Sequence, residues 1–84
     1  MELKDQIQFF EDNVRSITDI DYGDFMRKSN TYFNRLLGGF QGASEEQRKV
    51  LYSLKEMIQF SPERDIDLTT EKILELSNQL KRIV

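Results

Sequence analysis

Hydrophobic residues recur along this chain at the three- and four-residue intervals of an amphipathic helix, in four successive blocks. None of these blocks shows the strict alternation of apolar and polar residues that is typical of a half-buried strand. The first predicts a helix over about residues 2–17, with an apolar stripe made of Leu3, Ile7, Phe10, Val14 and Ile17. The second predicts a helix over about residues 22–37, with a broader, aromatic-rich face made of Tyr22, Phe25, Met26, Ser29, Tyr32, Phe33, Leu36 and Leu37.

The third block predicts a helix over about residues 45–60. Ser44 and Gln47 have the spacing of a capping box, in which each side chain hydrogen-bonds to the backbone N–H of the other residue. Pro62 ends this helix, because proline disfavours helical geometry in the preceding residue and donates no amide hydrogen bond. The expected buried side is made of Val50, Leu51, Leu54, Met57 and Ile58.

The fourth block predicts a helix over about residues 70–83. We expect Thr69 to be its N-cap, and Leu68 to pack on Ile73 as a hydrophobic staple. Four amphipathic helices with short connections predict an all-α fold, a compact four-helix bundle that makes residues 1–84 a single helical domain. The wider apolar faces of the second and third helices predict that these two contribute most of the core.

The ends of the second helix carry clear signals. Asp21 is a good N-cap, since its carboxylate can accept a hydrogen bond from a free amide of the first turn. Gly38 and Gly39 follow the last apolar residue, and we expect them to end the helix because glycine enters the left-handed conformation without strain.

The composition excludes most catalytic chemistry. The 84 residues include no cysteine and no histidine, so there is no thiol nucleophile, no zinc-thiolate site and no imidazole base. Paired carboxylates could act as acid and base, but they need a concave site that a domain this small has little room for. We therefore expect no enzyme, no cofactor and no metal. The absence of cysteine, of a secretory signal and of a long apolar span predicts a cytoplasmic protein without a membrane segment.

The net charge of −3 conceals an uneven distribution along the chain. Residues 1–26 hold seven acids and two bases (−5), residues 27–55 two acids and six bases (+4), and residues 56–84 six acids and four bases (−2). Ordinary solvated helix faces explain such a pattern without any function. The functional interpretation is an acidic surface that recognises a basic partner, and the overall charge counts against a general nucleic-acid binder.

The acidic residues form two local clusters, each at or just before a predicted helix start, where carboxylates are also favoured for structural reasons. The first, between helices one and two, consists of Asp19, Asp21 and Asp24. The second, after helix three, consists of Glu63, Asp65 and Asp67.

Neither a calcium loop nor a phosphate loop explains the motifs around these helices. In a calcium loop that starts at Asp19, Gly23 would stand at the fifth position instead of the sixth, and Asn30 would replace the bidentate glutamate. The glycine-containing stretch 37–42 lacks the Gly-Lys-Ser/Thr ending of a phosphate loop, so it is interpreted as a helix end and turn.

Three stretches together resemble the colicin D immunity family, small all-helical bacterial self-protection proteins. Residues 17–22, Ile-Thr-Asp-Ile-Asp-Tyr, precede an aromatic-rich second helix and are similar to the family's Ile-x-x-Ile-(Asp/Glu)-(Phe/Tyr). Residues 60–65, Phe-Ser-Pro-Glu-Arg-Asp, are similar to its aromatic-x-Pro-(Asp/Glu)-x-Asp after helix three. The closing helix, 73–83, follows an acidic and apolar stretch, as in the family.

The resemblance implies an inhibitor whose carboxylates cover the basic surface with which a toxin's nuclease domain, such as that of a tRNase, holds transfer RNA. Such a protein would occupy a site built for polyanions, with fast and salt-sensitive association. The positions that the resemblance assigns to partner binding, or that could extend the patch, are Glu63, Asp65, Asp67, Glu56, Asp19, Asp21 and Asp24.

Two other functions stay open from the sequence. A small adaptor or homodimeric interaction module would use exposed apolar residues, for which Phe9, Phe40 and Phe60 are the candidates. A helical DNA-binding regulator would use the basic start of helix three, with Arg48 and Lys49.

Overall fold

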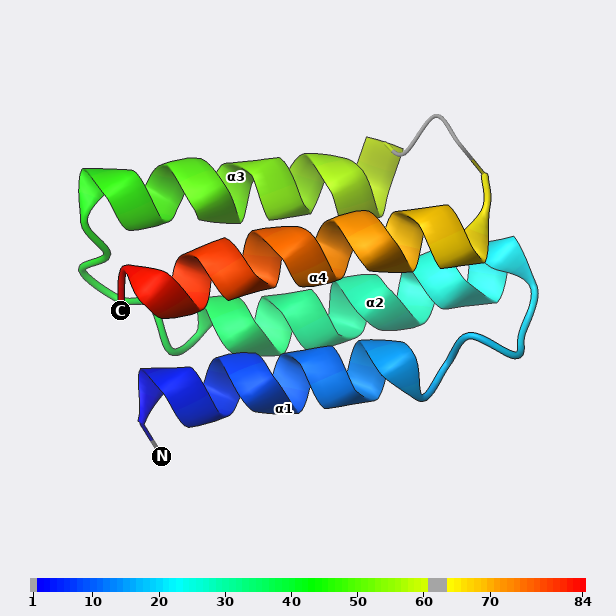
Figure 1. The fold of residues 1–84 in the computed structure, drawn as a ribbon, viewed down its shortest axis with the longest axis horizontal. Coiled ribbons are helices and arrows are strands. Elements are labelled where there is room, and N and C mark those ends of the chain that lie inside the picture. Colours follow the sequence, from blue (N-terminus) through cyan, green and yellow to red (C-terminus); the bar gives the residue numbers. More distant parts are fainter. Residues whose placement is uncertain (1, 61–63) are drawn as a thin grey trace.

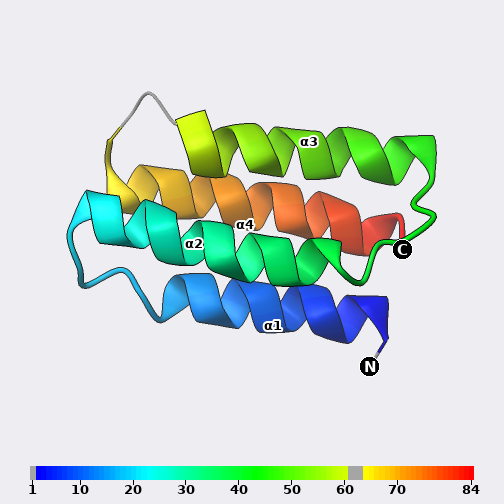
Figure 2. The same ribbon diagram turned by 180° about the vertical axis from the view of Figure 1, so that it is seen from behind.

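The computed structural model describes residues 2–60 and 64–84 and contains four α-helices within them. They are α1 (Leu3–Arg15), α2 (Tyr22–Leu37), α3 (Glu45–Phe60) and α4 (Ile66–Arg82). Each helix runs antiparallel to the one before it, and the four lie side by side along the long axis of the molecule (Figures 1 and 2). The predicted all-α four-helix bundle is confirmed.

The helices form a closed ring of neighbours. α1 packs against α2 and α4, and α3 packs against the same two helices, so α1 and α3 are diagonal partners. α1 and α3 therefore end, and α2 and α4 begin, at one end of the bundle, while the two chain termini and the α2–α3 connection lie at the other (Figures 1 and 2). This arrangement decides which surface residues can act together.

One hydrophobic core runs through the bundle, and the three helices α1, α2 and α3 contribute equally to it. Its buried apolar residues are Ile7, Phe10, Val14, Phe25, Phe33, Leu36, Leu51, Leu54, Ile58, Ile73 and Leu80, together with Ile17 and Phe40 from the connections. The rings of Phe10 and Phe33 meet edge to face, with their centroids 6.3 Å apart, across the α1–α2 interface. α2 and α3 together supply six of these eleven helical residues, so they contribute most of the core as predicted, but α1 supplies three, as many as either of them, although its stripe is narrower.

The fourth helix begins four residues earlier than predicted. Its N-cap is Asp65, whose carboxylate accepts a hydrogen bond from the N–H of Leu68 at 3.0 Å. Thr69, the expected cap, lies inside the helix and is fully buried. Asp65 caps well by local chemistry alone, whereas the branched side chain of Thr69 can fill core space one turn further on. The staple predicted for Leu68 is wrong for the same reason.

Other helix ends follow the sequence more closely. Asp21 caps α2 as predicted, and the capping box of α3 is present, with Gln47 N–H donating to Ser44 Oγ at 3.2 Å and Ser44 N–H donating to Gln47 Oε1 at 3.1 Å. α1 ends at Arg15, two residues before the predicted end. Ile17 nevertheless stays buried, because the chain turns back toward the core.

The glycines after α2 act differently from the prediction. Gly38 keeps right-handed helical angles (φ −59°, ψ −24°), so it does not provide a left-handed cap. At Gly39 the side chain of Gln6 occupies the space that a Cβ atom would need. The helix still ends after Leu37, and a larger side chain at position 39 would have to displace the tip of the Gln6 side chain.

A buried polar network joins the first and last helices. Glu11 on α1 is only 1% exposed, and its carboxylate accepts hydrogen bonds from the Ser77 hydroxyl (2.7 Å) and the Lys81 ammonium group (2.9 Å) on α4. Lys81 also donates to Gln8 Oε1 at 2.9 Å. Both carboxylate oxygens therefore have a donor, which is the condition for burying a charge without a large penalty.

We expect two buried serines to respond in opposite ways to substitution by alanine. Ser77→Ala removes a donor from the buried Glu11 carboxylate and should lower the free energy of unfolding by about 1–3 kcal/mol. Ser29 is equally buried, but its hydroxyl has no hydrogen-bond partner within the described residues, so Ser29→Ala should raise the free energy of unfolding by about 1 kcal/mol.

Urea denaturation followed by circular dichroism measures both changes on the same scale. The two variants control for each other, because each deletes one hydroxyl from a fully buried helical position. Destabilisation of similar size in both would contradict the contrast between a satisfied and an unsatisfied hydroxyl.

Candidate functional site

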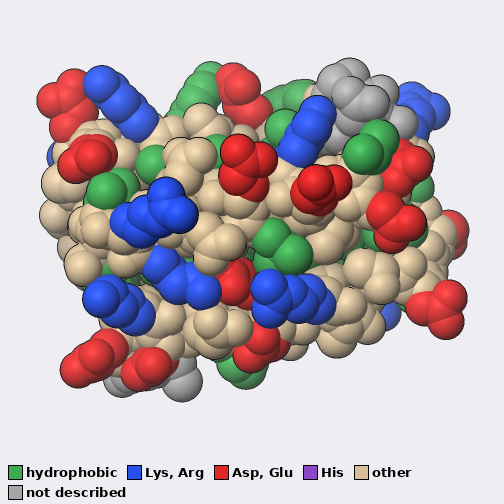
Figure 3. Space-filling view, viewed as in Figure 1, with side chains coloured by type: hydrophobic (Ala, Val, Ile, Leu, Met, Phe, Trp, Pro, Cys, Tyr) green, Lys and Arg blue, Asp and Glu red, His purple; other side chains and the backbone are tan. Residues whose placement is uncertain are grey.

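The topology brings the two acidic clusters to the same end of the bundle. Residues 16–24, which link α1 to the start of α2, contain three aspartates and no basic residue. Residues 64–68, which lead into α4, contain two aspartates and Arg64. In the space-filling view, Asp and Glu side chains predominate over the end at which α4 begins (right in Figure 3). We call this surface the acidic end, defined by Asp19, Asp21, Asp24, Asp65 and Asp67.

Three carboxylates of the acidic end have local structural roles. Asp21 and Asp65 are the N-caps of α2 and α4, and each accepts a hydrogen bond from the backbone N–H three residues on. Asp24 forms an ion pair with Arg27, with 2.7 Å between its Oδ1 and a guanidinium nitrogen. The two caps still present their negative charges to solvent, because both residues are exposed.

Asp19 and Asp67 are exposed, and no hydrogen bond or ion pair engages their side chains within the described residues. The same is true of Glu56, which lies on α3 one turn before the end of that helix. Glu63, also predicted to bind a partner, lies outside the described residues. Of the predicted positions, Asp19 and Glu56 thus have charge available without a visible structural role, whereas Asp67 also suits the positive end of the α4 dipole because it lies in the first turn.

Two exposed apolar residues border the connection from α3 to α4. Phe60 ends α3 and is 73% exposed, and Leu68 lies in the first turn of α4 and is 44% exposed. Phe60 was among the apolar candidates, whereas Phe40 is buried and Phe9 lies elsewhere, on α1. The sequence did not predict that Leu68 is exposed, because the expected N-cap at Thr69 placed Leu68 before the helix and packed it on Ile73.

Two helices end and two begin at this surface, so their dipoles largely offset one another. α3 ends here and has no basic residue in its last turn, so no side chain of that turn offsets the partial negative charge of its terminal carbonyls. α1 also ends here, and its last turn contains Arg15, which pairs loosely with Asp12 at 3.8 Å.

The described part of the chain offers little support for metal binding, for a membrane span or for DNA binding at Arg48. Within residues 2–60 and 64–84, no three carboxylate side chains converge in a way that could hold a metal ion. No helix there combines the length and apolarity needed to cross a bilayer. Arg48, a candidate for contacting DNA, lies at the opposite end of the bundle, and its Nε donates to the carbonyl of Ala43 at 3.0 Å.

Comparison with protein-family models, with curated proteins and with solved structures finds no match for this chain. The resemblance to the colicin D immunity family therefore stays a prediction that rests on the three sequence stretches alone.

We expect the carboxylates of the acidic end to differ in their importance for stability. Asp21→Ala and Asp65→Ala each remove an N-cap and should lower the free energy of unfolding by about 1 kcal/mol. Asp19→Ala removes an exposed carboxylate without a partner and should change it by less than about 0.5 kcal/mol. Denaturant titration of the three variants tests this order, and a loss at Asp19 equal to that at the caps would contradict it.

Proposed function

We propose that this protein is an immunity- or antitoxin-like inhibitor that binds the basic nuclease domain of a toxin through the acidic end. The observation that carries the proposal is the meeting of the α1–α2 and α3–α4 connections at one end of the bundle. Asp24 and Asp65, which are 41 residues apart in sequence, thereby contribute to one surface.

The chemistry of this surface suits a partner that binds polyanions. Carboxylates such as Asp19 and Asp67 are free to pair with lysine and arginine side chains that otherwise contact phosphate groups. A concentration of one sign of charge also accelerates the encounter with an oppositely charged protein.

The exposed apolar residues at the same end support a protein partner. Interfaces commonly combine a few large apolar or aromatic anchors with a polar rim. Phe60 and Leu68 supply such anchors beside the acidic residues. A homodimer through this end is disfavoured, because two copies would bring their carboxylates together.

The proposal is tested by co-expressing the protein with basic nuclease domains of bacterial toxins, the colicin D nuclease domain among them, and scoring cell survival. Against a nuclease that it neutralises, the double variant Asp19→Lys/Asp67→Lys should bind at least about tenfold more weakly, mostly through a slower association rate. Binding by the unchanged protein should weaken as salt rises from about 50 to about 300 mM.

The matched control is Asp5→Lys/Glu46→Lys, which changes the net charge equally at the opposite end of the bundle. Asp5 and Glu46 are exposed first-turn residues of α1 and α3, and no hydrogen bond or ion pair within the described residues engages their side chains. Asp21 and Asp65 are left intact, so that the loss of a cap is not mistaken for the loss of a contact. Equal binding by the two double variants would contradict the proposed surface.

A further inference from the structure

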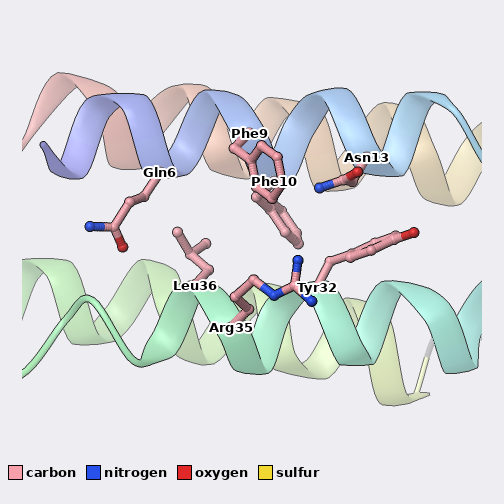
Figure 4. A pocket seen from close by; sticks show the side chains of 7 residues that line it. All are labelled: Gln6, Phe9, Phe10, Asn13, Tyr32, Arg35 and Leu36. Carbon is pink, nitrogen blue, oxygen red and sulfur yellow. The ribbon is translucent and has the colours of Figure 1, made fainter. Parts of the chain in front are cut away.

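A pocket of about 230 Å³ opens between α1 and α2, away from the acidic end. Its walls are largely apolar and include the rings of Phe9 and Phe10 from α1 and the side chain of Leu36 from α2 (Figure 4). An apolar cavity of about 150 Å³ in another protein is large enough to hold benzene. The volume here therefore suffices for a single aromatic ring with a short substituent.

The polar groups that border the pocket include two hydrogen-bond donors without acceptors. The amide nitrogen of Asn13 is buried and has no hydrogen-bond partner within the described residues. Arg35 forms no hydrogen bond or ion pair there either, and its guanidinium group points from α2 toward the Phe10 ring (Figure 4). The Asn13 nitrogen is too enclosed for a ligand to reach, whereas the Arg35 guanidinium group is exposed and can meet an anionic group at the mouth of the pocket.

The charged side chain that lines the pocket indicates which charge a ligand should carry. The lining residues are Gln6, Phe9, Phe10, Asn13, Tyr32, Arg35 and Leu36, and none of them is acidic. A guanidinium group at the border of an apolar cavity is suited to a carboxylate, which it can bind through two parallel hydrogen bonds. An apolar body with one anionic group thus matches both parts of the site.

We propose that this pocket binds a small aromatic carboxylate. The ring lies among Phe9, Phe10 and Leu36, and the carboxylate accepts hydrogen bonds from the guanidinium group of Arg35. The site goes beyond the proposed inhibitor function, since it shares no residue with the acidic end.

Titration of the isotope-labelled protein with phenylacetate, followed by amide chemical shifts, tests the proposal. We expect saturable shifts centred on residues 6–13 of α1 and 32–36 of α2. Phenylacetamide has nearly the same shape without the charge and should bind at least about tenfold more weakly. The absence of saturable shifts in this region with phenylacetate, or equal binding of the two compounds, would overturn the proposal.

Arg35→Gln should weaken phenylacetate binding at least about tenfold while leaving the pocket walls in place. Arg82→Gln is the matched control, because Arg82 is likewise an exposed arginine in the last turn of its helix, on α4. The amide spectra of the two variants also show whether each keeps the fold. Phenylacetate affinity that falls equally in both variants, or in neither, would overturn the role of Arg35.

Discussion

The buried carboxylate of Glu11 is the constraint on which the arrangement of this bundle depends. It is held by Ser77 and Lys81 of α4, which are 66 and 70 residues away in sequence, so it joins the first helix to the last. Apolar contacts alone tolerate small rotations and shifts of one helix against another. Hydrogen bonds to both oxygens of a buried carboxylate do not, because any shift leaves a charge without its donors. The network thereby fixes the rotation of α1 about its own axis and its position along the axis of α4.

The antiparallel order of the helices places the surface that we propose as functional, and the Glu11 network holds α1 and α4 together beside it. The connection from α1 to α2 therefore lies at the same end as the start of α4. The N-termini of α2 and α4 stabilise the carboxylates of Asp21 and Asp65 there, which offsets part of the repulsion within the acidic end. Asp67 also lies in the first turn of α4, but neither it nor Asp19 has a hydrogen-bond or ion-pair partner within the described residues, so both charges are available to an outside cation. Capping and binding thus use neighbouring but different carboxylates.

The sequence predicts the helices well because their periodicity and caps are local. Ser44 and Gln47 form the expected capping box, and Asp21 caps α2. The start of α4 was placed too late, since both Asp65 and Thr69 are good caps locally and only the burial of Thr69 in the core decides between them. Glu11 was missed although it stands four residues after Ile7 and three before Val14, at core spacing. The burial of a charged residue at that position cannot be predicted without knowing that Ser77 and Lys81, which are distant in sequence, donate hydrogen bonds to it.

The candidate site was predictable in part. An antiparallel order of four helices requires the first and third connections to share one end, so the joining of the two acidic clusters follows from the fold class. The fold class does not predict which carboxylates cap a helix and which are available to a partner, because that depends on where each helix starts. The pocket beside Arg35 was beyond prediction as well, since periodicity assigns residues to faces but does not show where two faces fail to fill the space between them.

The most direct test of the central claim is a titration of the isotope-labelled protein with hexalysine at low ionic strength, followed by backbone amide chemical shifts. If the two acidic clusters form one surface for basic partners, the amides of residues 18–24 and 64–68 shift together and with the same midpoint. The shifts disappear when about 300 mM salt is added, because exposed charges are then screened over a few ångströms. Shifts confined to one cluster, or spread evenly over the molecule, would contradict the account.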